Sequence, residues 1–167
     1  MTDLTARAAT AIESCRKAGI GVVLAESLTG GMIADTLISV PGASSVVVGS
    51  VVAYRNAAKQ DLLGIPAEVL AHNGAVSEVT AAAMASAVRS RITSEPTLHL
   101  IGLSATGVAG PDLQDGQPVG TVFLGLATEA GTEVRQFAFQ GDRIQIRSQA
   151  TNAALNWLIE TAEAIAN

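Results

Sequence analysis

The alternation of apolar and polar positions along the chain predicts helices and buried strands in turn. Residues 3–17 place apolar side chains at helical spacing on one face. Continuous apolar runs at 21–25 and 46–54 are typical of strands buried on both faces of a parallel sheet. Between these runs, residues 32–40 are expected to form a helix, because the pattern is helical and Pro41-Gly42 follows it.

The second half of the chain continues this alternation of helices and strands and then predicts a β-hairpin. We expect helices at 56–63, 66–72 and 77–91, a third strand at 98–104, a hairpin of strands at 119–128 and 133–139, and a final helix at 143–165. This order predicts an α/β fold of three layers. Its mixed sheet would be parallel at its start, antiparallel at the hairpin and flanked by helices. We find no linker or repeat, so residues 1–167 are interpreted as a single domain.

Composition excludes several classes of protein. The chain has 167 residues, of which 49 % are apolar and 15 % charged, which argues against a disordered protein. A net charge of −5 without a basic tract argues against nucleic acid or an anionic membrane as the main partner. No apolar run approaches a membrane span, and the N-terminal residues do not resemble a secretory signal. A cytoplasmic location is therefore expected.

The scarce residue types narrow the chemistry. One cysteine, Cys15, excludes an internal disulfide and a cysteine-based zinc site, and with only two histidines no metal site is expected. His99 lies within an apolar strand and is interpreted as a core residue, and His72 lies at a helix end. Of the ten basic residues only Lys17 and Lys59 are lysines.

Three polar stretches follow the predicted parallel strands, at the sheet edge where such folds bind ligands. The first contains Ser27, Thr29, Gly30 and Gly31. Paired glycines and a following helix suit an anion or an oxyanion, because the backbone is accessible and the helix offers free N–H groups. The same residues would also make an ordinary helix cap with a tight turn.

The second stretch joins a strand to a helix. It contains Asn56, and it carries the only tyrosine, Tyr54, and Lys59 five residues further on. Desolvation near a strand end lowers the pKa of a lysine and can turn it into a base. A solvated surface lysine beside a tyrosine at the sheet edge is the competing interpretation.

The third stretch repeats the hydroxyls and glycines of the first, with Ser104, Thr106, Gly107 and Gly110. Such a segment offers donors to an anion or a developing oxyanion, or it is a plain loop. Arg143 opens the final helix, where it would clamp a phosphate or a carboxylate, or else be solvated.

These stretches together resemble one family closely. In family order, and over almost the whole chain, the sequence resembles the C-terminal domain of the competence/damage-inducible protein CinA. Stand-alone versions of that domain are known as nicotinamide-nucleotide amidohydrolases (PncC). The residues that carry the resemblance are AESLTGG at 25–31, VAYRNAAK at 52–59, GAVSE at 74–78, TGVAGP at 106–111, PVGTV at 118–122 and GDR at 141–143.

The resemblance implies hydrolysis of the carboxamide of nicotinamide mononucleotide to nicotinate mononucleotide and ammonia, without a cofactor or metal. It implies Ser27 as nucleophile and Lys59 as base, with Tyr54 as a relay or positioning group. The family threonine matches Thr106 and the family arginine Arg143. Backbone N–H groups of either glycine-containing stretch would hold the oxyanion, and the other stretch with Arg143 the 5′-phosphate. The expected substrate contacts are Thr29, Gly30, Gly31, Asn56, Ser104, Gly107, Gly110 and Arg143.

Three alternatives stay open at this point. One is a non-catalytic module of the same fold that binds a pyridine nucleotide or has a regulatory role, because fold does not fix function. The others are an amidase for a different small amide and, against the charge, a DNA-associated protein. The sequence departs from the family at Leu28 and at 112–116. A mean hydropathy of +0.38 with few charges also suits a homo-oligomer.

Overall fold

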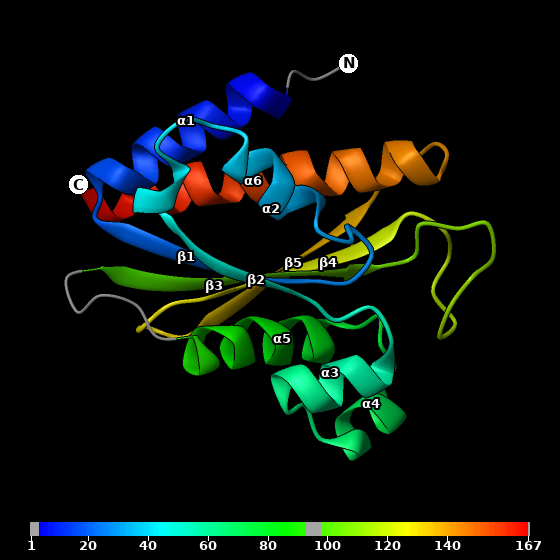
Figure 1. Cartoon of the computed structure of the whole chain (residues 1–167). Helices are drawn as coiled ribbons and strands as arrows, with labels where there is room; N and C mark the ends of the chain where they lie inside the picture. Colours follow the sequence, from blue (N-terminus) through cyan, green and yellow to red (C-terminus); the bar gives the residue numbers. More distant parts are fainter. Residues whose placement is uncertain (1–3, 93–97, 167) are drawn as a thin grey trace.

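A five-stranded sheet forms the middle of three layers in the computed structural model, which describes residues 4–92 and 98–166. The strands lie in the order β2-β1-β3-β4-β5, and helices cover both faces of the sheet (Figure 1). The predicted α/β fold class is thereby confirmed. The strands are β1 (Ile20–Glu26), β2 (Val47–Val52), β3 (His99–Gly107), β4 (Thr121–Ala127) and β5 (Thr132–Ala138).

The helices divide between the two faces (Figure 1). One face is covered by α1 (Leu4–Lys17), α2 (Met32–Ile38) and α6 (Arg143–Ala166), and the other by α3 (Asn56–Leu63), α4 (Ala67–Asn73) and α5 (Glu78–Arg91). A short 3₁₀ helix, Ala43–Ser45, precedes β2. Among the described helices, none is both long and apolar enough to cross a membrane, the 24-residue α6 included.

The sheet is mixed, as predicted. β1 pairs in parallel with both β2 and β3, whereas β3, β4 and β5 pair antiparallel. The carboxyl ends of β1, β2 and β3 therefore meet at one edge of the sheet. The helices α2 and α3 begin soon after β1 and β2 at that edge, so chemistry-bearing loops gather there.

β1 shows why a continuous apolar run is needed in the centre of this fold. Successive side chains of a strand point to opposite faces. Val22 and Leu24 pack into the core beneath α1, α2 and α6, whereas Val23 and Ala25 pack into the core beneath α3 and α5. Because helices cover both faces, every residue of β1 is buried.

Three sequence predictions were wrong in detail. The run at 46–54 is not a strand buried on both faces, because β2 is the outermost strand of the sheet and its Val52 is 45 % exposed. His99 is exposed at the start of β3 and is not a core histidine. β3 continues to Gly107, so Thr106 and Gly107 belong to the strand and not to the loop after it. Pairing with β1 and β4 extends the strand beyond its most apolar part.

Candidate active site

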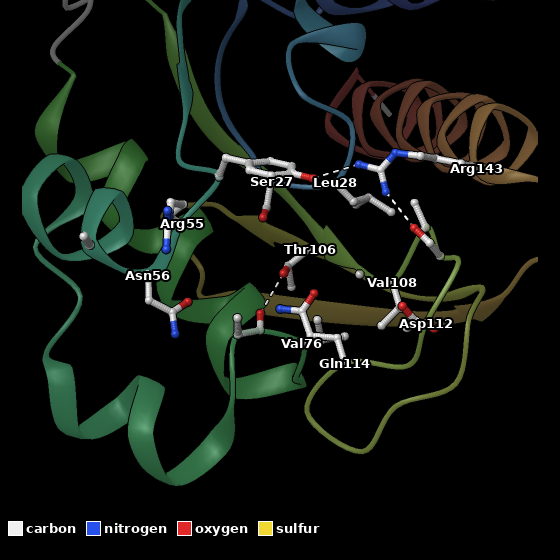
Figure 2. Close-up of a pocket in the computed structure, with 16 residues that line it drawn as sticks. Ser27, Leu28, Arg55, Asn56, Val76, Thr106, Val108, Asp112, Gln114 and Arg143 are labelled. Carbon is white, nitrogen blue, oxygen red and sulfur yellow. Dashed lines mark hydrogen bonds between the residues drawn. The ribbon is translucent and has the colours of Figure 1, made fainter.

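A cleft of about 470 Å³ opens at the carboxyl ends of the parallel strands, within the size range of small-molecule sites (Figure 2). Segments far apart in the sequence form its walls, and Arg143 reaches it from the start of α6. The lining residues are Ser27, Leu28, Tyr54, Arg55, Asn56, Ala57, Ala75, Val76, Thr106, Gly107, Val108, Ala109, Gly110, Asp112, Gln114 and Arg143.

Ser27 is the first residue after β1 and is held firmly by the sheet. Its backbone N–H donates to the carbonyl of Ala105 at 2.8 Å, and its own carbonyl accepts from the N–H of Gly30 at 3.1 Å. The residue is only 8 % exposed, and its hydroxyl points into the cleft (Figure 2). The strand therefore presents one buried hydroxyl to whatever fills the cleft.

Lys59 lies behind this serine, on the first turns of α3, and is 1 % exposed. Its Nζ is 3.1 Å from Ser27 Oγ and donates to the carbonyls of Ala53 at 3.0 Å and Tyr54 at 3.3 Å. Burial lowers the pKa of Lys59 from its usual 10.5 to about 8, and the charge of Asp115 opposes this shift. The structure thus brings Ser27 and Lys59 into direct contact, beside a ligand-sized cleft.

The side chain of Tyr54 is directed elsewhere. Its hydroxyl accepts from Nη2 of Arg143 at 2.7 Å, while Nη1 of Arg143 donates to the carbonyl of Gly110 at 2.9 Å. The hydrogen bond between Tyr54 and Lys59 is made by the backbone carbonyl of Tyr54. A relay through the phenol, as the resemblance implied, has no counterpart in this geometry. Tyr54 instead helps Arg143 close one side of the cleft.

Thr106 also lines the cleft, and its side chain links β3 to the segment before α5 by a hydrogen bond. Its Oγ1 donates to the carbonyl of Ala75 at 2.7 Å. Asp115 holds the same segment from the loop after β3, because its Oδ2 accepts from the N–H of Ala75 at 2.7 Å and from that of Val76 at 3.3 Å. The cleft wall therefore depends on a carboxylate that sequence reasoning did not single out.

The turn after Ser27 does not offer the anion site that its glycines suggested. The carboxylate of Glu26 accepts from the N–H groups of Gly31 at 3.0 Å, Ile33 at 3.1 Å and Ala34 at 2.9 Å. The N-terminus of α2 is thus already capped by a side chain that is fully buried. Gly30 and Gly31 have φ angles of 60° and 94°, which makes them turn residues, as in the competing interpretation.

Four of the predicted substrate contacts accordingly lie outside the cleft: Thr29, Gly30, Gly31 and Ser104. Thr29 is completely buried, and Ser104 Oγ donates to the carbonyl of Ala81 inside the domain. Asn56, Gly107, Gly110 and Arg143 do line the cleft, together with Ser27, Tyr54 and Thr106.

Sequence reasoning missed several cleft residues, among them Arg55, Asp112 and Gln114. The amide of Gln114 reaches into the cleft from the loop after β3 (Figure 2). In the sequence, residues 112–116 of that loop stand out as a departure from the family, and Asp112 and Asp115 are too few for a metal site. A polar loop at the carboxyl edge of a parallel sheet is the signal that could have found these side chains.

Comparison with known proteins decides the family. The model of the CinA C-terminal domain family matches residues 4–162. The chain belongs to this family. A CinA-like protein of Anaeromyxobacter sp. is 48 % identical over 141 residues, which cover 84 % of this chain and 33 % of that protein. For a CinA-like protein of Geotalea daltonii the identity is 44 % over 144 residues, covering 86 % and 34 %. The chain spans about a third of the length of these relatives.

Solved structures of CinA-family proteins share the fold. The competence/damage inducible protein CihA of Agrobacterium tumefaciens is 34 % identical, with a TM-score of 0.87 and coverage of 96 % of both chains. A CinA superfamily protein of Klebsiella pneumoniae is 26 % identical, with a TM-score of 0.90 and coverage of 98 % of this chain and 99 % of that one. The three-layer arrangement is therefore that of the CinA superfamily.

Proposed function

We propose that this CinA-family domain hydrolyses the carboxamide of nicotinamide mononucleotide to nicotinate mononucleotide and ammonia. The contact between Lys59 Nζ and Ser27 Oγ, 3.1 Å long and beside the cleft, is the observation that carries this proposal. A serine needs an adjacent base to become a nucleophile, and a buried amine of lowered pKa is such a base. The choice of substrate rests on membership of the family.

The three acceptors around Lys59 Nζ accommodate both protonation states of the amine. A charged lysine has three N–H donors, whereas the neutral amine has two donors and one lone pair. The carbonyls of Ala53 and Tyr54 occupy two donors. In the neutral amine the lone pair is then left for Ser27, whose hydroxyl donates to it. The two carbonyls thus aim the base at the nucleophile.

The proposed reaction has two halves. Ser27 Oγ attacks the carboxamide carbon while its proton passes to Lys59, which forms a tetrahedral oxyanion. The C–N bond then breaks, the leaving nitrogen takes the proton from Lys59, and ammonia departs from an ester on Ser27. In the second half a water molecule loses a proton to Lys59, attacks the ester carbon and releases the acid, and the proton returns to Ser27.

The cleft also limits where the rest of the substrate binds. Because Glu26 occupies the N-terminus of α2, we assign the oxyanion contacts to the other glycine-containing segment, which lines the cleft at Thr106 and Gly107. Arg55 and Arg143 place two guanidinium groups on the cleft wall. Guanidinium groups bind phosphate through paired N–H donors, so these two arginines are the proposed 5′-phosphate contacts.

The test measures ammonia and nicotinate mononucleotide formed from nicotinamide mononucleotide. The wild-type protein should release both in equal amounts, and Ser27→Ala should lose at least about a thousandfold in kcat, the scale on which catalytic nucleophiles act. Ser45→Ala, at an exposed serine outside the cleft, is the matched control and should keep full activity. Binding of the nucleotide without release of ammonia by the wild type would favour the non-catalytic module instead.

A further inference from the structure

Arg147 reaches from α6 to the turn that follows Ser27. Its Nε donates to the carbonyl of Leu28 at 2.9 Å, and its Nη2 donates to the carbonyl of Thr29 at 2.7 Å. These are the two residues directly after the serine. One guanidinium therefore holds two consecutive peptide groups of this turn, from a position about 120 residues away in the chain.

We propose that Arg147 is a positioning residue that fixes the orientation of Ser27 for attack. This inference rests on the proposed function, since it concerns the same nucleophile. Arg147 is not among the residues that line the cleft, and its hydrogen bonds go to the turn after Ser27. Arg143, one helical turn earlier, differs because it does line the cleft.

Both N–H groups and carbonyl groups between Ser27 and the first turn of α2 are bonded to side chains. Glu26 accepts from N–H groups at the start of α2, and Arg147 donates to carbonyl groups of Leu28 and Thr29. The guanidinium also lies close over Gly30, where an added Cβ would be 3.4 Å from Nη2. Arg147 thus holds the carbonyls directly after Ser27, and Glu26 holds the start of the helix that follows them.

The chemistry of arginine makes this clamp specific. A guanidinium offers several N–H donors in a rigid plane, so it can bond two neighbouring carbonyls at once. A lysine ammonium carries the same charge but is a single point at the end of a flexible stem, and a glutamine carries no charge. Substituting each in turn separates the loss of the planar donors from the loss of the positive charge.

The experiment compares Arg147→Lys and Arg147→Gln with the wild type by steady-state kinetics. We expect kcat to fall roughly ten- to hundredfold in both, because displacing a nucleophile by about 1 Å has effects of that size. KM should change less than about twofold, because Arg147 does not touch the cleft. An unchanged kcat, or a change confined to KM, would overturn the proposal.

A matched control is available at Arg91, whose Nε donates to the carbonyl of Leu63 at 2.7 Å, outside the cleft. Arg91→Gln removes a comparable carbonyl clamp and should lower thermal stability while leaving kcat within about twofold of the wild type. A loss of kcat in Arg91→Gln equal to that in Arg147→Gln would show a general effect of destabilisation and would contradict the proposal.

A readout that does not require turnover separates this proposal from the proposed function. Backbone hydrogen exchange, followed by mass spectrometry, should become faster in the peptide that spans residues 27–34 of both Arg147 variants and stay unchanged in α1. If the wild type has no amidase activity but this exchange pattern is found, the proposed function fails and the clamp on the turn stands. Unchanged exchange in that peptide would refute the clamp itself.

Discussion

The two lysines of this chain lie in opposite environments. Lys17 is at the end of α1, where its side chain is 68 % exposed and Nζ lies 3.3 Å from the carboxylate of Glu13. Lys59 is 1 % exposed and bonds only to carbonyl oxygens and a hydroxyl. The difference teaches that burial without a carboxylate in hydrogen-bond contact, and not residue type, is what prepares an amine to act as a base.

Replacing both lysines in the same way gives the largest expected contrast. Lys59→Met should lower kcat at least about a thousandfold, because Ser27 loses its base. Lys17→Met should leave kcat within about twofold, because it removes only an exposed ion pair. Steady-state assays of ammonia release check both. Activity in Lys59→Met within tenfold of the wild type would refute the role of the base.

The substitution Lys59→Met should stabilise the folded protein although it abolishes activity. At pH 7 the folded protein keeps a mostly charged amine in a buried site, so Lys59→Met should raise the free energy of unfolding by about 1–3 kcal/mol. The wild type should recover this difference as the pH rises from about 8 to 10.5, because there the unfolded chain binds the extra proton. Denaturant unfolding at pH 7 and at pH 10 measures the two differences. A destabilised Lys59→Met at pH 7 would be inconsistent with this account.

The pH dependence of the reaction comes next in size. Since the pKa of Lys59 is lowered to about 8, the neutral fraction of the amine rises from about one tenth at pH 7 to about nine tenths at pH 9. The ratio kcat/KM should therefore increase by up to about tenfold over this interval and level off above it. A rate that is flat from pH 6.5 to 9.5 would show that the neutral amine does not limit the reaction.

Asp115 gives a finer adjustment of the same amine. Its charge raises the pKa of Lys59, against the larger effect of burial. Asp115→Asn should therefore move the rising limb of the pH profile to lower pH, by less than about one pH unit. The same change weakens the bonds to the N–H groups of Ala75 and Val76, so KM should also rise. A shift to higher pH would contradict the assigned electrostatic effect.

Tyr54→Phe has the smallest expected effect. Removing the phenol hydroxyl takes one hydrogen bond from Arg143 but leaves the backbone carbonyl that aims Lys59. We expect kcat to change less than about fivefold and KM to rise, because Arg143 loses one of its two anchors at the cleft. A hundredfold fall in kcat would indicate that the phenol hydroxyl takes part in proton transfer and would contradict this account.

Much of the fold could be predicted from local pattern. The apolar run at 21–25 predicted β1, which is buried along its whole length because helices cover both faces. The helix expected at 77–91 is α5, and Ser77 caps it by accepting from the N–H of Thr80. The position of β2 as the outermost strand of the sheet could not be predicted from the local pattern. Its β-branched residues resemble those of a central strand, and only the pairing order shows which side is open.

The parts of the candidate site that could be predicted are the residues that follow a parallel strand. Ser27 and Lys59 each follow a strand at the carboxyl edge, so their meeting follows from the parallel sheet. The capping of the N-terminus of α2 could not be predicted, because it depends on the side chain of Glu26 turning back to accept from the N–H groups of that helix. The contacts of Arg147 and Asp115 join segments about 120 and 40 residues apart, and no local pattern encodes such partners.

The most direct test of the account is a titration of the two lysine side chains by NMR, with ¹³C label at Cε. Because the chain has only two lysines, the spectrum holds two signals, and Lys17 serves as the internal reference for an exposed amine. The account predicts that the signal absent from Lys59→Met titrates with a pKa of about 8, well below the usual lysine value of 10.5. A Lys59 signal that titrates near 10.5 would contradict the central claim that Lys59 is available as a neutral base beside Ser27.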